Sequence, residues 1–191
     1  MSTLQFNEAD HTYAIDGKPV PGVTSIIGSV LNVQHWAEEW HLERGRVNHA
    51  CYALIGQGKT FKHDPASLEW VRGCRRFFAE VRPDVIATEL RVKSDLYQYA
   101  GALDLLAHMA GGVTVVDYKN SKGPLDVIQC AAYAIAWEEE SGEKVRQVVS
   151  VEINGDGTYH MGDIVTGAKL MRARRKFLAC RTVYGIKERV G

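Results

Sequence analysis

Residues 101–119 decide the fold, and they read GALDLLAHMAGGVTVVDYK. Leu and Val dominate on both sides of the central Ala-Gly-Gly, which predicts two neighbouring β-strands joined by a tight turn. With Ala110-Gly111 as a two-residue turn, Asp104 lies directly opposite Asp117. With Gly111-Gly112 as the turn, Asp104 lies opposite Lys119, and in both cases the three polar residues share one face of the sheet. A three-residue loop would place Asp104 on the other face.

The apolar neighbours of these polar residues predict that both strands are central and buried. Two carboxylates on adjacent strands lie about 5 Å apart and repel each other by roughly 3 kcal/mol at an effective dielectric constant of about 20. Such a pair requires a proton or a cation. Hard oxygen ligands from two strands suit Mg²⁺ or Mn²⁺. A buried Asp–Lys ion pair, with Asp104 as an incidental neighbour, explains the spacing equally well.

Outside this stretch, the hydrophobic periodicity predicts a mixed α/β protein. We expect an N-terminal hairpin within 1–21 and helices between 23 and 56, with a break near Asn32. A third helix begins at Asp64-Pro65. The order of elements, α-βββ-α-β, predicts a single domain over 1–191 with a central mixed sheet flanked by helices. The later elements are expected as strands at 85–93, 97–109 and 113–120, a helix at 125–140, a hairpin within 145–165 and a helix over 167–189.

Composition limits the classes of function. The chain has 191 residues, 46% of them hydrophobic, and 23 Lys and Arg against 23 Asp and Glu. A net charge of zero excludes a protein that coats nucleic acid by bulk electrostatics, so any such contact must come from local patches. Two patches are candidates: a basic C-terminal helix within 165–191, and the cluster of Arg72, Arg75 and Arg76. A solvated helix face is the alternative for both.

The cysteines and the N-terminus indicate the compartment. The four cysteines stand far apart, without the CxxC pair typical of zinc or cluster sites, so we expect buried thiols in a reducing cytosol. The N-terminus lacks the basic and then apolar pattern of a signal peptide, and no run of 18 apolar residues is present. We therefore expect no membrane association.

Further motifs accompany the two central strands in a fixed order. An Arg-Gly pair precedes a histidine on a predicted helix, and a glutamate lies on the first strand of the meander. Glutamine and tyrosine stand four residues apart, on one face of the helix that follows the strands. These residues are Arg44, Gly45, His49, Glu89, Gln129 and Tyr133.

Together with Gly101-x-x-Asp104 and Asp117-x-Lys119, this order resembles the RecB-like exonuclease branch of the PD-(D/E)XK nuclease superfamily, which includes phage members. Each motif alone is weak, but their order and spacing together are specific, and the resemblance spans roughly residues 11–135. The resemblance implies a restriction-endonuclease-like core. Some relatives hold an iron-sulfur cluster on cysteines near the C-terminus, but Cys180 stands alone there, so no cluster is expected.

For the catalytic centre, the resemblance implies metal ligation by the His49 nitrogen, by Asp104 and Asp117, and by the main-chain carbonyl of Tyr118. Lys119 would orient or activate the attacking water. The expected cofactor is Mg²⁺ or Mn²⁺, which polarises the scissile phosphate. On base rate alone, His49 would be an ordinary helix histidine, and its place in this set is what marks it as a ligand.

Other residues receive supporting roles. The resemblance implies that Gln129 and Tyr133 contact nucleic acid or brace the site, with core packing as the alternative for Tyr133. Glu89 completes a second metal site or pairs across the strands with a basic neighbour. Arg75 and Arg76 are candidates for contact with the phosphate backbone.

The sequence therefore predicts a Mg²⁺- or Mn²⁺-dependent deoxyribonuclease, an exonuclease in phage-type recombination, repair or DNA processing. The expected substrate is single- or double-stranded DNA, with ends preferred, in the cytoplasm of a bacterium or a phage-infected host. A recombination partner protein is compatible with that role. Three alternatives stay open: an endonuclease on the same fold, a nucleic-acid-binding module with little activity, and a purely structural ion pair. Cleavage polarity and oligomeric state are not predicted.

Overall fold

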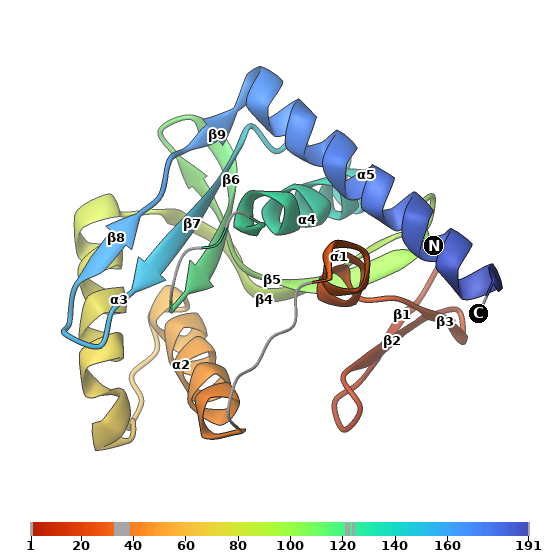
Figure 1. Cartoon of the computed structure of the whole chain (residues 1–191). Coiled ribbons are helices and arrows are strands. Elements are labelled where there is room, and N and C mark those ends of the chain that lie inside the picture. The colour runs from red at the N-terminus through yellow and green to blue at the C-terminus, as the bar shows by residue number, and fades with distance from the viewer. Residues whose placement is uncertain (1, 33–38, 121–122, 124, 191) are drawn as a thin grey trace.

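A six-stranded mixed β-sheet forms the centre of the molecule (Figure 1). The computed structural model describes residues 2–32, 39–120, 123 and 125–190. The strands follow the order β4-β5-β6-β7-β8, with β9 also paired to β7, so that β5 and β6 are central as predicted. Within this sheet, β5 is antiparallel to both β4 and β6, and β7 runs parallel to β6. The bounds are β4 (Asp84–Ser94), β5 (Tyr99–Met109), β6 (Gly112–Lys119), β7 (Gln147–Ile153), β8 (Tyr159–Met161) and β9 (Val165–Thr166).

Helices cover both faces of this sheet, which confirms the predicted fold class. A parallel strand pair requires a crossover connection, and α4 (Asp126–Ser141) provides it between β6 and β7. The helix α4 lies on one face of the sheet together with α1 (Val23–Leu31) and α5 (Gly167–Val190). The helices α2 (Glu39–Gly56) and α3 (Leu68–Val81) lie on the other face, and the short 3₁₀ helix η1 (Pro65–Ser67) leads into α3.

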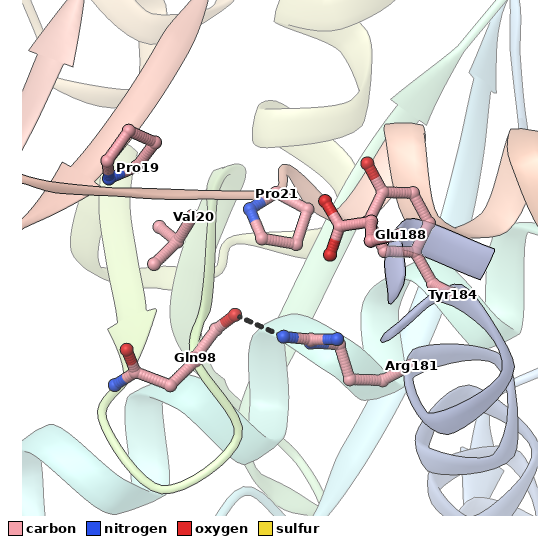
Figure 2. A pocket seen from close by; sticks show the side chains of 7 residues that line it. All are labelled: Pro19, Val20, Pro21, Gln98, Arg181, Tyr184 and Glu188. Carbon is pink, nitrogen blue, oxygen red and sulfur yellow. Dashed lines mark hydrogen bonds between the residues drawn. The ribbon is translucent and has the colours of Figure 1, made fainter. Parts of the chain in front are cut away.

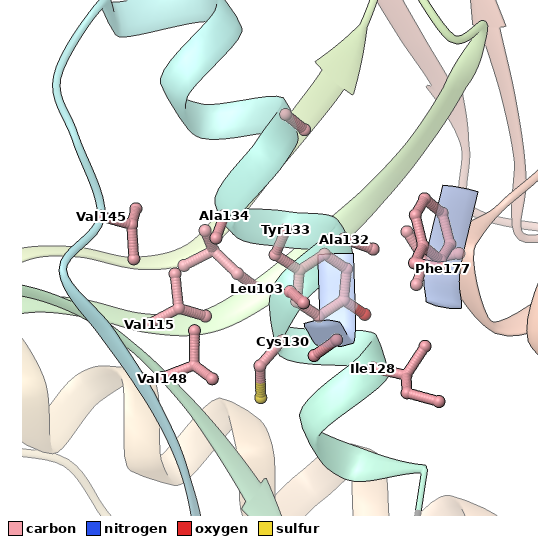
Figure 3. Packing of buried hydrophobic residues seen from close by; sticks show 14 of the residues in the cluster. Leu103, Val115, Ile128, Cys130, Ala132, Tyr133, Ala134, Val145, Val148 and Phe177 are labelled. Atoms are coloured by element: carbon pink, nitrogen blue, oxygen red, sulfur yellow. The ribbon is translucent and has the colours of Figure 1, made fainter. Parts of the chain in front are cut away.

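The sheet separates two hydrophobic cores. The α4-side core contains residues of β5, β6 and β7 packed on α4 and α5, and Figure 3 shows Tyr133 and Cys130 of α4 beside Leu103 and Val115 of the sheet. The α2-side core is smaller and consists of Tyr52, Cys74, Phe77, Leu105, Ala107, Val116, Tyr118, Val149, Val151 and Ile153. All four cysteines are buried free thiols, as expected. None of the described helices is long and apolar enough to cross a membrane.

The N-terminal segment forms a three-stranded antiparallel sheet, so the prediction of a simple hairpin within 1–21 was incomplete. Its strands are β1 (Leu4–Asn7), β2 (Thr12–Ile15) and β3 (Lys18–Val20). The predicted Asp16-Gly17 turn joins β2 to β3, and both residues have positive φ angles of 50° and 75°. The extra strand forms because Leu4 and Phe6 alternate with polar residues and pack their side chains against Tyr13, Ile15 and Val20.

An ion pair fixes α5 against the end of α4. Arg174 of α5 donates from Nη2 to Glu138 Oε1 at 2.7 Å and from Nη1 to Glu138 Oε2 at 2.9 Å. Glu138 also accepts a hydrogen bond from the Val145 backbone N–H at 2.8 Å, and its side chain is 9% exposed. Burial raises the pKa of Glu138, but the hydrogen bonds and charge of Arg174 outweigh burial and hold it below its usual value.

We expect Arg174→Met to lower the free energy of unfolding by about 3 kcal/mol at pH 7, because it leaves a largely buried carboxylate with weaker partners. The folded-state pKa of Glu138 is depressed, so the ion pair stabilises above the unfolded-state pKa. The difference from the parent protein should therefore shrink as the pH falls below 4.5 and through the lower folded-state pKa. Urea denaturation at several pH values measures it. Exposed Arg175 offers the control Arg175→Met, expected to change stability by less than about 0.5 kcal/mol.

Candidate functional site

Three carboxylates form one row across the strands β4, β5 and β6. The β5–β6 pairing runs from Met109–Gly112 to Leu105–Val116, so Ala110-Gly111 is a two-residue turn and Asp104 and Asp117 occupy the next opposed positions. This register is the first of the alternatives predicted from the sequence. On the other side of β5, Leu105 pairs with Thr88 of β4, and Leu103 pairs with Leu90. Between these two pairs, Glu89 lies opposite Asp104.

The row lies where β5 and β6 separate. Their backbone pairing ends at Leu105–Val116. Beyond it, the Tyr118 backbone N–H donates to Asp104 Oδ2 at 2.6 Å instead of to a carbonyl of β5. The N–H and C=O of one strand residue point toward the same neighbouring strand. The Tyr118 carbonyl therefore also faces the space beside Asp104, which is compatible with its predicted role as a metal ligand.

At this row, β4 and β5 exchange the faces of their side chains. Leu103 packs in the α4-side core, whereas Leu105 packs in the α2-side core, so strict alternation is broken at Asp104. On β4, Thr88 lies beside Gly56 at the end of α2 and accepts a hydrogen bond from Gln57, the next residue, whereas Leu90 packs against the α4-side core. Between them, Glu89 has a left-handed backbone with φ 48°. The exchange makes the carboxylates reachable from helices on both faces of the sheet.

His49 reaches the row from α2. Its Nδ1 lies 3.1 Å from Asp104 Oδ1 and 3.8 Å from Glu89 Oε1. The three residues place one potential ligand atom each within 4.8 Å of one another. Burial lowers the pKa of His49, but Asp104 and Glu89 together raise it to about 10, so the imidazole is cationic in this arrangement. A positive charge is thus already required between the two carboxylates.

The chemistry of this donor set fits a hard divalent cation. One imidazole nitrogen and two carboxylates converge, and Asp104 is 8% exposed. Burial raises the pKa of Asp104, but the charge of His49 and further hydrogen bonds outweigh burial and keep it low, so Asp104 is ionised. The two carboxylates are oxygen donors of the kind that Mg²⁺ and Mn²⁺ prefer, and the imidazole adds one nitrogen donor beside them. The sequence treated Glu89 as an optional ligand, yet the structure brings it to His49 and Asp104.

Asp117 and Lys119 form a second group beside this cluster, on the α4 side of β6. Lys119 Nζ lies 2.7 Å from Asp117 Oδ2, and Asp117 is 2% exposed. Burial and the nearby charge of Asp104 raise the pKa of Asp117 to about 7, although Lys119 opposes the rise. Asp117 was predicted as a metal ligand together with Asp104, and in the structure its carboxylate is paired with Lys119 instead of with His49.

A chain of contacts from α4 holds the lysine. Lys119 Nζ donates to Gln129 Oε1 at 3.0 Å, and Gln129 Nε2 donates to the Tyr133 hydroxyl at 2.9 Å. The Tyr133 ring packs on β5 at Gly101, where a Cβ atom would lie 2.6 Å from Tyr133 Cε1. Gln129 thus links Tyr133 to Lys119, an arrangement in which the two α4 residues can brace the site. The sequence identified Gly101 through its spacing to Asp104. It did not reveal that the absence of a side chain at Gly101 leaves room for the Tyr133 ring.

The two arginines expected to bind DNA lie on α3 and have other contacts. Arg76 Nε lies 2.7 Å from Glu80 Oε1, and the Arg75 guanidinium lies 5.7 Å from the centre of the Phe61 ring. The structure does not bring them into the group formed by His49, Glu89 and Asp104. The Glu80 pair has the i,i+4 spacing of a helix surface, so the sequence contained the signal for it.

A pocket of about 260 Å³ lies elsewhere, between β3 and the C-terminal half of α5 (Figure 2). Arg181 lies in it, and its guanidinium donates to the backbone carbonyls of Tyr97 at 2.9 Å and Gln98 at 3.1 Å. These bonds tie α5 to the β4–β5 turn. The pocket contains none of the carboxylates of the row, and its arginine has a structural partner.

Comparisons with known proteins give matches to solved structures alone. No family model matches the sequence, and no curated protein matches it. A protein of Eubacterium rectale assigned as an exonuclease is similar over 82% of this chain and 73% of its own, at 10% identity and a TM-score of 0.41. The alkaline exonuclease of Laribacter hongkongensis is similar over 87% of this chain and 88% of its own, at 13% identity and a TM-score of 0.43. At these values neither match transfers residues or activity.

The contact between Gly101 and Tyr133 leads to a test of the brace. We expect Gly101→Ala to lower the free energy of unfolding by about 1–3 kcal/mol, because the added methyl group overlaps the Tyr133 ring and lies 3.2 Å from Val23 Cγ2. Urea denaturation measures the change. In α2, a Cβ at Gly45 meets nothing within 4 Å, so Gly45→Ala should leave stability unchanged or raise it by about 0.5–1 kcal/mol. Equal effects of the two substitutions would contradict the close packing.

Proposed function

We propose that this chain is a metal-dependent nuclease that hydrolyses phosphodiester bonds in DNA. The observation that carries the proposal is the convergence of His49, Glu89 and Asp104 beside the Lys119–Asp117 pair. A structural ion pair alone requires neither a second carboxylate opposite Asp104 nor an imidazole from another helix. The order and spacing of the sequence motifs resemble those of the RecB-like branch of the PD-(D/E)XK nucleases, which also supports a nuclease function.

Mg²⁺ or Mn²⁺ would be held by His49, Glu89 and Asp104, with the Tyr118 carbonyl facing the same space. Asp117 is the next carboxylate in the row and is available if Lys119 releases it. When bound, the cation supplies positive charge that stabilises the phosphate in its transition state. Because His49 is cationic without metal, binding of the cation also displaces a proton from its imidazole.

In the proposed reaction, Lys119 acts on the attacking water and on the phosphate. Its side chain is 23% exposed, and its ammonium group contacts Asp117 and Gln129. Two fixed partners aim the charge at one position, where it orients an attacking water and stabilises the negative charge that develops on the phosphate. Burial would lower the pKa of Lys119, but Asp117 raises it above its usual value, so Lys119 acts as a cation rather than as a general base.

We further propose an exonuclease of phage-type recombination, repair or DNA processing, acting in the cytoplasm. The motif order, which resembles that branch, supports this choice. An endonuclease with the same centre is the second candidate. A DNA-binding module with little activity is the third, and the presence of both the ligand cluster and the lysine speaks against it.

The first test is cleavage by the Lys119→Met variant. We expect cleavage of linear DNA by the wild type with Mg²⁺ or Mn²⁺, none with EDTA, and a loss of about 100-fold or more in kcat for Lys119→Met, because one fixed charge at the transition state is removed. DNA affinity should change much less. The matched control is Lys169→Met at an exposed position of α5, which should cleave at the wild-type rate.

Equal cleavage by wild type and Lys119→Met would refute the proposed role of the lysine, and no cleavage by the wild type under any metal condition would refute the nuclease. Covalently closed circular DNA, tested beside the linear form, distinguishes the candidates. An exonuclease leaves the circle intact, whereas an endonuclease opens it.

The second test is calorimetric titration with Mn²⁺. We expect one or more sites in the wild type, no detectable binding by Asp104→Asn, and about tenfold weaker binding by Glu89→Gln, since both substitutions remove an anionic ligand. Glu143→Gln, in the exposed segment after α4, serves as the control. Circular dichroism melting checks that each variant is folded. If the carboxylate row is only a structural ion-pair network, the wild type and the variants will all fail to bind Mn²⁺.

A further inference from the structure

The N-terminal sheet is anchored on the β4–β5 hairpin at a fixed position beside the carboxylate row. The Ala100 backbone N–H of β5 donates to the Pro21 carbonyl at 3.1 Å, and Lys93 Nζ of β4 donates to Ser2 Oγ at 2.6 Å. Between these anchors, Ala100 packs in a small hydrophobic cluster with Tyr13 of β2. Since the sheet is held at both ends, side chains on its near surface have a defined position relative to β4.

Three aromatic rings gather on this sheet. The rings of Phe6 and His11 lie 5.1 Å apart between centroids at 87°, and those of His11 and Tyr13 lie 6.2 Å apart at 77°. His11 is exposed, whereas Tyr13 is buried. Neither contact is stacked, and the imidazole of His11 is exposed to solvent, so no parallel ring covers it. The backbone of His11 is left-handed, with φ 52° in the β1–β2 turn.

Phe6 also holds a cation. The Arg91 guanidinium of β4 lies 4.3 Å above the centre of the Phe6 ring, and Arg91 is exposed. The nearby carboxylates have other partners, because Glu89 faces His49 at 3.8 Å and Asp95 pairs with Lys93 at 2.8 Å. Phe6 thus contacts both an exposed imidazole and an exposed guanidinium.

This surface adjoins the carboxylate row. Arg91 is two residues after Glu89 on the same strand. The charges of both residues act on the hydroxyl of Tyr13: burial raises its pKa, Arg91 lowers it and Glu89 raises it. The aromatic cluster and its cation therefore lie near the outermost carboxylate of the row, along β4.

We propose that His11 and Arg91 form a binding subsite for an unpaired nucleotide of the DNA strand that enters the carboxylate row. The imidazole stacks on the base and the guanidinium contacts its phosphate, while Phe6 fixes both. The subsite rests on the proposed nuclease function, and it narrows the substrate to DNA whose strand is single or frayed at this position. A base within a duplex is already stacked on both sides, whereas an unpaired base offers its face to an aromatic ring.

The test is binding of single-stranded DNA by variants of the two residues. All proteins carry Lys119→Met so that the strand stays intact, and affinity for a fluorescein-labelled oligothymidylate is measured by anisotropy with Mg²⁺. We expect His11→Asn and Arg91→Gln each to weaken binding by about tenfold. Asparagine is chosen because it tolerates the left-handed backbone of His11.

Two further measurements separate stacking from charge. On an abasic oligonucleotide of the same length, His11→Asn should lose nothing, because no base is present to stack, whereas Arg91→Gln should still bind more weakly. Arg91→Gln should also reduce the slope of log affinity against log salt by about 1, the value for one phosphate contact. The matched controls are His160→Asn on β8, at the opposite edge of the sheet, and Arg172→Gln at an exposed position of α5.

Unchanged binding by His11→Asn, an equal loss on the normal and the abasic strand, or a parent protein that binds neither oligonucleotide would overturn the subsite. Thermal melting shows whether each variant is folded. If His11→Asn is unfolded, the measurement is repeated with His11→Gly, which also adopts the left-handed backbone, and unchanged binding by that variant overturns the subsite. Metal-dependent cleavage by the wild type is measured separately. Cleavage with no effect of His11→Asn rejects the subsite alone, whereas intact DNA with every metal rejects the nuclease.

Discussion

The need to compensate negative charge within the sheet organises this molecule. Glu89, Asp104 and Asp117 occupy one row across β4, β5 and β6, and Asp104 and Asp117 are nearly inaccessible to solvent. Buried carboxylates in such proximity are unstable unless positive charge or hydrogen-bond donors reach them. His49 from α2 and Lys119 at the end of β6 supply the charge. Where β5 and β6 separate, the Tyr118 backbone N–H donates to Asp104.

The sequence predicted the parts of this arrangement that follow from strand periodicity and turn chemistry. The Ala110-Gly111 turn fixes the register of β5 and β6, so that opposition of Asp104 and Asp117 follows by counting. The left-handed backbone of Glu89 and the exchange of faces at Leu103 and Leu105 could not be predicted, because periodicity assumes an unbroken pleat. For the same reason, the distribution of ligands over two groups was missed.

Elsewhere, the predictions failed where tertiary contacts decide the outcome. The first strand of the N-terminal sheet forms through packing of Leu4 and Phe6, a weak pattern in four residues. The net charge of zero did not show where single positive charges lie, and the structure places Arg91 on Phe6 and Lys119 beside Asp117. Composition therefore excludes bulk electrostatic binding but says nothing about a site built from single cations.

The brace on Lys119 explains how the site can serve both with and without a cation. Without it, Asp117 holds the lysine through a buried ion pair. If Asp117 turns toward a cation, the lysine would lose its charged partner, yet Gln129 still binds it through a neutral amide oxygen that does not compete for metal. Tyr133 fixes that amide, and Gly101 leaves room for its ring. The glycine of one strand thereby preserves the position of the lysine on the next, through two side chains of α4.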